Sequence, residues 1–273
     1  MIKLLNGLEA TVEGLLYTGV KFFYSSSAFP NNRLLLYALK RFREVNRICI
    51  QTNNDKETLG RFIGAGITGT KLSASNEALK IDLLNYPDFP ALIIDISNEF
   101  NYLYNKFITI IPSNIQNIYN LTIEAFNISQ YLKRIVILKI EKVFSDIYSD
   151  INISENILPI EKTYIEKLEN SYSIYETYDT NDSEILIISY GFISEIIKEN
   201  IKYLSQNKKI GLFKLITLNP LPLEEIKQLN YRNNKIIMVN IPFINSISEK
   251  IININEYDVN KVINEIKFVI SNL

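Results

Sequence analysis

Short apolar runs alternate with helical patterns through the first half of the chain. Runs such as ALIIDI and FITIIP are apolar on both faces, as in strands of a parallel sheet that helices cover. These runs predict strands at Val20–Tyr24, Ile48–Thr52, Ala91–Ser97, Phe107–Pro112 and Arg134–Ile140. The segments between them predict helices at Glu9–Thr18, Asn32–Phe42, Asp55–Ala65, Asn76–Leu84 and Ile115–Tyr131. This order favours an α/β unit built on a mainly parallel sheet.

The pattern stops after residue 141 and returns near residue 183. Residues 142–182 are rich in Tyr, Glu, Asp, Asn and Ser, and we interpret them as a connector with some local structure, either a hairpin or an extended arm. Beyond it, strands are predicted at Ile185–Ser189, Ile210–Leu215 and Lys235–Asn240, and helices at Phe192–Ser205, Leu223–Leu229 and Asp258–Ile270. We therefore expect two α/β domains, at residues 1–141 and 183–273, joined by that connector.

The stretch Gly7–Pro30 predicts a small-residue helix, a short apolar strand and a loop at the carboxyl end of that strand. Ligands of open α/β sheets bind at such loops. The loop Ser25–Pro30 nevertheless carries no acid, base or cation. It predicts a ligand-binding architecture whose chemistry is supplied from elsewhere.

Three turns follow predicted strands, and the first two each allow two interpretations. Asp55 and Glu57 begin a helix, where they either cap its N-terminus or hold a carboxylate over a ligand. Ser189–Gly191 is either a plain strand-to-helix turn or an anion site at a helix N-terminus. Thr217–Pro222 contains two prolines and is predicted to be an extended, rigid turn before the next helix. The exact order of its residues carries information beyond the prediction of a turn.

Capping residues and glycines add local expectations. Ser113 and Asn114 can cap the helix that starts at Ile115. Gly60, Gly64 and Gly66 lie along one predicted helix, where glycine lowers helix stability. We expect these glycines to allow the close approach of another backbone.

Composition narrows the possible chemistry. The chain has 273 residues and a net charge of −1, and no basic stripe with interleaved aromatics indicates nucleic-acid binding. It has no histidine, and its one cysteine, Cys49, cannot hold zinc or an iron–sulfur cluster and is predicted to be a buried strand residue. The apolar runs are too short for a signal peptide or a membrane span, which predicts a soluble cytoplasmic protein.

Several segments, in order, carry a family resemblance. GLEATVEGLLYTGVKFFYSSSAFP resembles the opening of the α subunit of the 2-oxoacid:ferredoxin oxidoreductases, in their pyruvate and 2-oxoglutarate members. Further matches are Gly60, Ile63–Ala65, Gly69 and Lys71, then Leu121–Phe126 and Tyr190-Gly191. The sequence is most similar to the family pattern at Lys209–Pro222, KIGLFKLITLNPLP. The resemblance covers nearly the whole chain outside the connector.

The resemblance implies a thiamine-diphosphate pyrimidine-type domain followed by a transketolase C-terminal-like domain. It implies oxidative decarboxylation of a 2-oxo acid to an acyl-CoA, with electrons passing to ferredoxin. A partner β subunit would bind the diphosphate and magnesium and carry an iron–sulfur cluster, with γ and δ subunits and ferredoxin as further partners. Thiamine diphosphate would lie between the α and β subunits, and this chain would hold no metal or cluster of its own.

The chain departs from the family pattern around the implied site. Asp55 falls on the glutamate that contacts thiamine, and it is one methylene shorter. Phe29 falls on a threonine whose hydroxyl faces the substrate in the family, and the segment after Lys71 is shortened. We assign Asp55 to cofactor binding and name no catalytic residue and no metal ligand. Two hypotheses follow: an active subunit that uses Asp55, or a catalytically degenerate, structural α-like subunit that stabilises a partner complex. A third, a small-molecule binder with no redox role, stays open because the shortened segments could leave room for another ligand.

Overall fold

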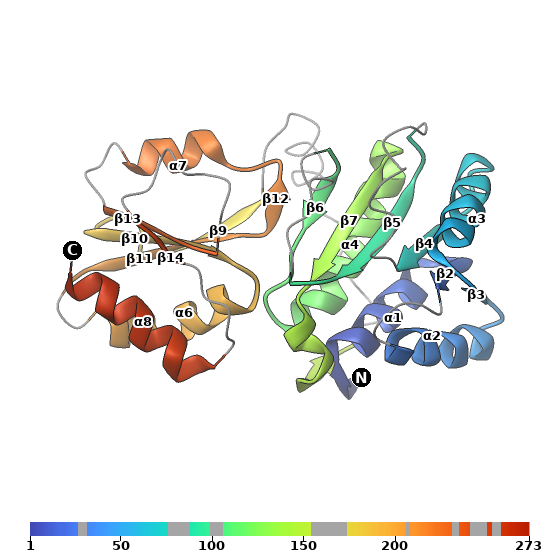
Figure 1. Ribbon diagram of the computed structural model, residues 1–273, viewed down its shortest axis with the longest axis horizontal. Helices are drawn as coiled ribbons and strands as arrows, with labels where there is room; N and C mark the ends of the chain where they lie inside the picture. The colour runs from blue at the N-terminus through green and yellow to red at the C-terminus, as the bar shows by residue number, and fades with distance from the viewer. Residues whose placement is uncertain are drawn as a thin grey trace.

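The computed structural model describes residues 1–26, 32–75, 88–98, 106–153, 174–205, 208–230, 235–240, 250–252 and 258–272, with the backbone alone at Asn32, Asp55, Asn230 and residues 250–252. These residues form two α/β units that lie side by side (Figure 1). We call residues 1–153 the first unit and residues 174–272 the second unit.

The first unit is built on a seven-stranded sheet with the strand order β12-β6-β7-β5-β4-β2-β3. Its strands are β2 (Phe22–Ser26), β3 (Ile48–Thr52), β4 (Leu72–Ser75), β5 (Ala91–Ile96), β6 (Ile108–Ile110), β7 (Ile135–Ile140) and β12 (Thr217–Asn219). All pairings in it are parallel except that of β12 with β6. The edge strand β12 belongs in sequence to the second unit, so the two units share this sheet.

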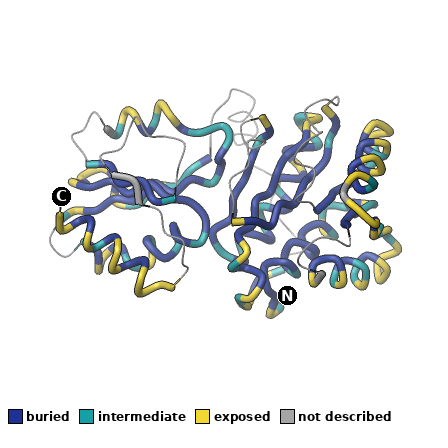
Figure 2. Tube along the Cα trace, viewed as in Figure 1, coloured by how far each residue is buried: buried dark blue, intermediate teal, exposed yellow. Residues whose placement is uncertain are grey.

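Helices cover both faces of the first sheet. They are α1 (Gly7–Thr18), α2 (Asn32–Glu44), α3 (Asp55–Ile67) and α4 (Ile115–Leu132). Successive strand side chains point to opposite faces, so Phe23 packs in the core with α1, α2 and α4, and Tyr24 packs in the core with α3. Apart from the edge strand β3, the strands are buried along most of their length (Figure 2), as expected of a parallel sheet covered on both faces.

The helix starts of the first unit follow from local capping. Asn6 accepts a hydrogen bond from the N–H of Glu9 at 3.0 Å, and the Glu9 carboxylate accepts the N–H of Asn6 at 3.2 Å, so α1 begins with a capping box. Gly19 ends α1 at φ +79°, in the left-handed region where glycine is favoured. Asn114 caps α4 by accepting the N–H of Asn117 at 2.8 Å.

The second unit has a five-stranded sheet in the order β14-β13-β10-β11-β9. Its elements are β9 (Tyr175–Tyr178), β10 (Ile185–Tyr190), α6 (Gly191–Leu204), β11 (Ile210–Leu215), α7 (Leu223–Asn230), β13 (Lys235–Val239), β14 (Lys250–Ile252) and α8 (Val259–Ser271). Ile187 packs with α6 and α8 on one face, while Leu186 and Ile188 pack toward α7 on the other. Ile111 of the first unit joins this second core.

The predicted α/β class with mainly parallel sheets is confirmed, and so are the main strands of both units. The sequence patterns missed several short strands: β4, β12, β14 and the antiparallel pair β1 (Ile2–Asn6) with β8 (Tyr148–Asn152). The helix predicted at Asn76–Leu84 lies outside the described residues.

The predicted connector contains a short 3₁₀ helix, η4 (Lys142–Ser145), and strands from two different sheets. Strand β8 pairs with β1 of the first unit, and β9 pairs antiparallel with β11 of the second. The two strands do not pair with each other, so they do not form a hairpin. Both are short and carry polar residues, and their partners lie far away in the sequence, which is why no local pattern reveals them. The domain boundaries at 1–141, 142–182 and 183–273 stay predictions.

Glycines along α3 do not have the role expected of them. A Cβ at Gly66 would lie 2.2 Å from the ring of Phe89. The absence of a side chain at Gly66 therefore makes room for the Phe89 ring, and not for another backbone as expected. Among the described residues, a Cβ at Gly60 or Gly64 would meet nothing within 4 Å.

Candidate functional site

The strand order of the first sheet changes direction at β2. From β2 the chain passes through α2 to β3 on one side, and then through α3 to β4 on the other side. The helices on either side of β2 therefore cover opposite faces of the sheet. Such a switch point is where open α/β sheets bind ligands. Ser25 and Ser26, the first residues of the loop that the sequence singled out, lie at this switch point.

Buried hydroxyl groups line this switch point. Ser25, Ser26, Thr52 and Ser75 are all buried at the carboxyl ends of their strands. The Ser75 hydroxyl donates to the Ser25 hydroxyl at 2.7 Å, and the Thr52 hydroxyl donates to the Ser25 carbonyl at 3.2 Å. The Thr52 hydroxyl also contacts the hydroxyl of Thr58 on α3. The arrangement can offer neutral hydrogen bonds to a ligand, and by itself it supplies no titratable group.

Asp55, the residue assigned to cofactor binding, is the first residue of α3 and follows β3 at the same edge of the sheet. Asn54 caps α3 by accepting the N–H of Glu57 at 3.0 Å, and the Glu57 carboxylate accepts the N–H of Asn53 at 3.0 Å. That backbone hydrogen bond, followed by the contact with Arg61, holds the pKa of Glu57 below its usual value. The capping interpretation is therefore confirmed for Glu57, and the capping residue itself is Asn54. The Asp55 side chain and Phe29 lie outside the described residues.

Charged residues that no motif signalled occupy the carboxyl ends of β5 and β7. Asp95 and Lys139 are register partners on these neighbouring parallel strands, and both are buried. The Lys139 ammonium donates to the Ser97 carbonyl at 2.7 Å and contacts the Ser97 hydroxyl at 3.3 Å. The available signal was the charge itself, since Asp and Lys interrupt the apolar runs ALIIDI and IVILKI near their carboxyl ends.

The turn Ser189–Gly191 does bring an anion to a helix N-terminus, and that anion is a side chain of the first unit. The Glu141 carboxylate accepts the N–H of Phe192 at 2.6 Å. Gly191 has φ +61°, and a Cβ there would lie 2.2 Å from the Glu141 Oε2 atom. Glycine is therefore required both by the backbone conformation and by the close approach of the carboxylate.

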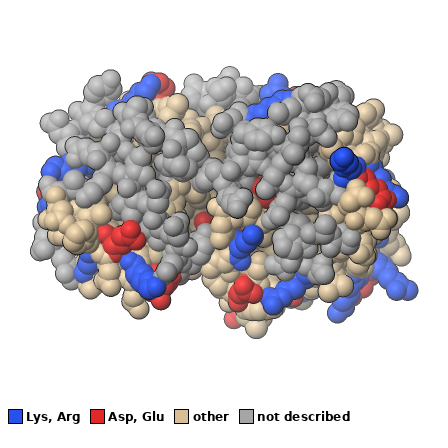
Figure 3. All heavy atoms as spheres, viewed as in Figure 1, with Lys and Arg blue, Asp and Glu red and all other residues tan. Residues whose placement is uncertain are grey.

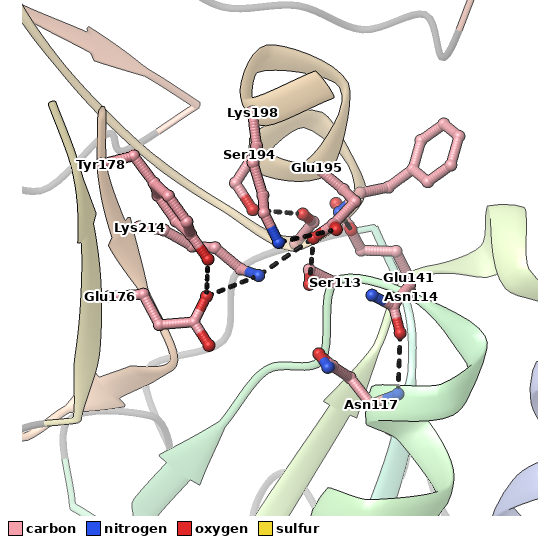
Figure 4. Close-up of polar contacts among 12 residues, drawn as sticks. Ser113, Asn114, Asn117, Glu141, Glu176, Tyr178, Ser194, Glu195, Lys198 and Lys214 are labelled. Atoms are coloured by element: carbon pink, nitrogen blue, oxygen red, sulfur yellow. Dashed lines mark hydrogen bonds and ion pairs between the residues drawn. The ribbon is translucent and has the colours of Figure 1, made fainter. Parts of the chain in front are cut away.

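A second polar cluster joins the units beside this turn (Figure 4). Glu195 of α6 accepts the Ser113 hydroxyl at 2.9 Å and pairs with the Lys214 ammonium at 3.0 Å, and Lys214 also pairs with Glu176 at 3.1 Å. Burial alone would raise the pKa of Glu195, but Lys214, Ser113 and Lys198 together hold it below its usual value. Ser113, expected as a cap, thus bonds across the interface.

Nucleophilic and metal chemistry find little support in the described residues. Burial raises the pKa of the Cys49 thiol to about 12, so the half-buried thiol in β3 stays protonated near neutral pH. Within the described ranges, no group of three or more His, Cys, Asp or Glu residues could hold a metal ion. On the face drawn in Figure 3, the described basic and acidic side chains are interspersed.

No helix in the described part of the chain is both long enough and apolar enough to cross a bilayer.

Comparison with known proteins gives sequence matches at low identity. Residues 183–269 match the family described as pyruvate:ferredoxin oxidoreductase core domain II. The ketoisovalerate oxidoreductase subunit VorB of Methanothermobacter marburgensis is 21% identical over an alignment of 291 positions, which covers 83% of this chain and 82% of that protein. VorB of Methanothermobacter thermautotrophicus is 20% identical, with the same coverage of each chain.

Similar solved structures extend the likeness to both units. A 2-oxoglutarate:ferredoxin oxidoreductase from Magnetococcus marinus, solved with 2-oxoglutarate, coenzyme A and succinyl-CoA, matches with a TM-score of 0.80 at 13% identity. The match covers 98% of this chain and 65% of that one, so the chain spans somewhat less than two thirds of its neighbour. A transketolase from Campylobacter jejuni matches with a TM-score of 0.62 at 11% identity, over 98% of this chain and 47% of that one.

The structural likeness shows the fold, which is that of a thiamine-diphosphate pyrimidine-type unit followed by a transketolase C-terminal-like unit. The sequence matches and the structural likeness agree in the kind of protein that this chain resembles, namely the 2-oxoacid oxidoreductases.

Proposed function

We propose that this chain is the α subunit, or an α-like subunit, of a 2-oxoacid:ferredoxin oxidoreductase. The reaction would break the bond between C1 and C2 of a 2-oxo acid, release CO₂ and join the remaining acyl group to the sulfur of coenzyme A. The electrons released would pass to ferredoxin. The observation that carries the proposal is the fold likeness over 98% of the chain, joined to a family match on the second unit.

The residues at the β2–β4 switch point fit the pyrimidine half of thiamine diphosphate. A pyrimidine ring with its amino group calls for hydrogen-bonding groups and one acid, and this edge offers the buried hydroxyls of Ser25, Ser26 and Ser75 together with Asp55 at the start of α3. When bound, the cofactor supplies the nucleophilic carbon that adds to the 2-oxo carbonyl. In this proposal Asp55 holds a proton against the pyrimidine N1′ atom, and the hydroxyls orient the ring.

The diphosphate, the magnesium ion and the iron–sulfur chemistry would belong to a partner β subunit. Among the described residues, no group of three or more His, Cys, Asp or Glu side chains could bind a metal ion. We accordingly propose a hetero-oligomer in which γ and δ subunits and ferredoxin are further partners.

A second candidate is a structural α-like subunit that stabilises its partner without supporting turnover. One observation favours it: the Ser25 and Ser75 hydroxyls already bond to each other at 2.7 Å, and Thr52 bonds to the Ser25 carbonyl. Hydroxyls satisfied in this way have less to offer a ligand.

The decisive experiment is to purify the chain with its natural partner subunits, with clusters and magnesium loaded. Reduction of ferredoxin or a viologen dye is then measured with thiamine diphosphate, coenzyme A and a series of 2-oxo acids. Turnover supports the active subunit, and its absence in a complete complex leaves the structural role.

If turnover is present, Asp55→Ala should abolish it, while Asp55→Glu should retain it because the longer acid has the family's length. Asp150→Ala removes an exposed carboxylate of β8 and serves as the matched control. Activity that survives in Asp55→Ala would remove Asp55 from the proposal.

A further inference from the structure

Each unit places a carboxylate at the start of a helix of the other unit. Glu141 directly follows β7 of the first unit, is almost fully buried, and accepts the N–H of Phe192 in the first turn of α6 at 2.6 Å. The first N–H groups of a helix lack partners within the helix and favour an anion. In this chain a side chain of the neighbouring unit supplies that anion.

The reverse contact runs from the second unit to the first. Ser113 is the residue before Asn114, the cap of α4, and its hydroxyl donates to the Glu195 carboxylate of α6 at 2.9 Å. The buried Lys214 of β11 holds the same carboxylate at 3.0 Å (Figure 4). We call the Glu141–Phe192 and Ser113–Glu195 bonds the reciprocal carboxylate contact.

Backbone and apolar contacts extend this interface. The Ile111 N–H donates to the Ile216 carbonyl at 2.8 Å, next to the pairing of β12 with β6. Phe144 of the first unit and Phe192 of the second pack edge to face, with ring centroids 5.6 Å apart.

We propose that the reciprocal carboxylate contact fixes the two units as one rigid body. The second unit is then held against the carboxyl ends of β6 and β7, where Ser113 and Glu141 follow these strands. The inference requires no bound cofactor, so it holds or fails independently of the proposed function.

The test compares Gly191→Ala with Gly19→Ala in the full-length chain. Both glycines have positive φ, at +61° and +79°, so both substitutions place a side chain in the left-handed region that disfavours it. Only the Cβ at position 191 would meet the Glu141 carboxylate, since at Gly19 it would meet nothing within 4 Å among the described residues.

Hydrogen exchange followed by mass spectrometry measures how fast the backbone amides of α6 and of residues 108–113 exchange in each variant. Gly191→Ala should accelerate exchange about tenfold to a hundredfold, as expected for loss of a charge-assisted hydrogen bond, both in the first turn of α6 and across the interface at residues 108–113. Gly19→Ala should leave both segments unchanged. Acceleration confined to α6, with residues 108–113 unchanged, would overturn the proposal.

A milder variant keeps the test valid if Gly191→Ala does not fold. Ser113→Ala removes one hydroxyl of the first unit and should accelerate exchange at the start of α6 in the second, whereas Ser149→Ala, at an exposed hydroxyl of β8, should not. If Ser113→Ala leaves α6 as protected as it is in the parent chain, the contact does not couple the units.

Discussion

Replacing Glu13 with alanine should destabilise the first unit far more than replacing Glu44, although both carboxylates pair with Arg41. The Glu13 side chain is 6% exposed and that of Glu44 is 44% exposed. Glu13 accepts hydrogen bonds from the Arg41 Nε atom at 2.5 Å, the Tyr37 hydroxyl at 2.9 Å and the Lys3 ammonium at 3.0 Å. One carboxylate of α1 therefore joins β1, α1 and α2.

The magnitude follows from this burial. Breaking a fully buried pair costs about 3–5 kcal/mol. Arg41 and Lys3 keep 22% and 29% exposure and regain water once Glu13 is gone, so we place the loss from Glu13→Ala at or below the lower limit of that range, at about 2–3 kcal/mol. Glu44→Ala breaks an exposed pair within one helix, worth about 0.3–0.5 kcal/mol.

Urea unfolding followed by circular dichroism measures both losses, and hydrogen exchange within α1 and α2 assigns them to the first unit. Equal losses for the two variants would refute the reasoning, because they would mean that burial does not decide the strength of the pair.

The pH dependence provides a second check on Glu13. Burial opposes ionisation of Glu13, but the bonds from Arg41, Lys3 and Tyr37 outweigh it and hold the pKa below its usual value. A lowered folded-state pKa contributes stability above the pKa of the unfolded chain and loses it as the pH falls through the folded value. The stability difference between the parent chain and Glu13→Gln should therefore be constant above about pH 5 and shrink in acid. A difference that grows toward low pH would contradict this sign.

Three further predictions concern single side chains. Burial raises the pKa of Glu124 to about 6 from an ordinary 4.5, so the parent chain should lose stability as the pH rises from 4.5 to 6. In thermal unfolding at pH 7.5, Glu124→Gln should therefore be more stable than the parent chain by up to about 2 kcal/mol. This gain should disappear below pH 4.5, where Glu124 is protonated in both the folded and the unfolded chain. Gly66→Ala forces a methyl group onto the Phe89 ring and should cost about 1–3 kcal/mol in urea unfolding, whereas Gly60→Ala, on an open helix surface, should gain about 0.5–1 kcal/mol. Cys49 should react with iodoacetamide at pH 8 far more slowly than free cysteine and at the ordinary rate in urea, because burial raises its pKa to about 12; fast labelling of the folded chain would contradict that.

Elements that show a strong local pattern could be predicted, and elements whose partners lie far away in sequence could not. Strand β5, written ALIIDI, is buried along its whole length, and its run of apolar residues predicted it. Strand β12 has only three residues and lies in a segment whose prolines predicted a turn, yet it pairs with β6 of the other unit. That pairing depends on where the second unit docks, which no local window contains.

The candidate site divides in the same way. The sequence singled out the loop Ser25–Pro30 and the helix start at Asp55, and the structure places Ser25, Ser26 and the start of α3 beside one switch point. It could not have paired Ser25 with Ser75, because Ser75 ends a strand that carries no clear pattern of its own. Nor could it have assigned Ser113 to Glu195, since a serine before a helix is first of all a capping residue.

By itself, the sequence determined the α/β class, the main strands, the Asn114 cap of α4 and the order of segments that resembles an oxidoreductase subunit, because propensity, periodicity and capping act over a few residues. Only the tertiary structure decided which carboxylate meets which helix. Glu141 reaches the N-terminus of α6 across 51 positions of the sequence, and Glu195 meets Ser113 across 82. Contacts of that separation exist only once both sheets are packed, since the free energy that holds them comes from burying the two units against each other.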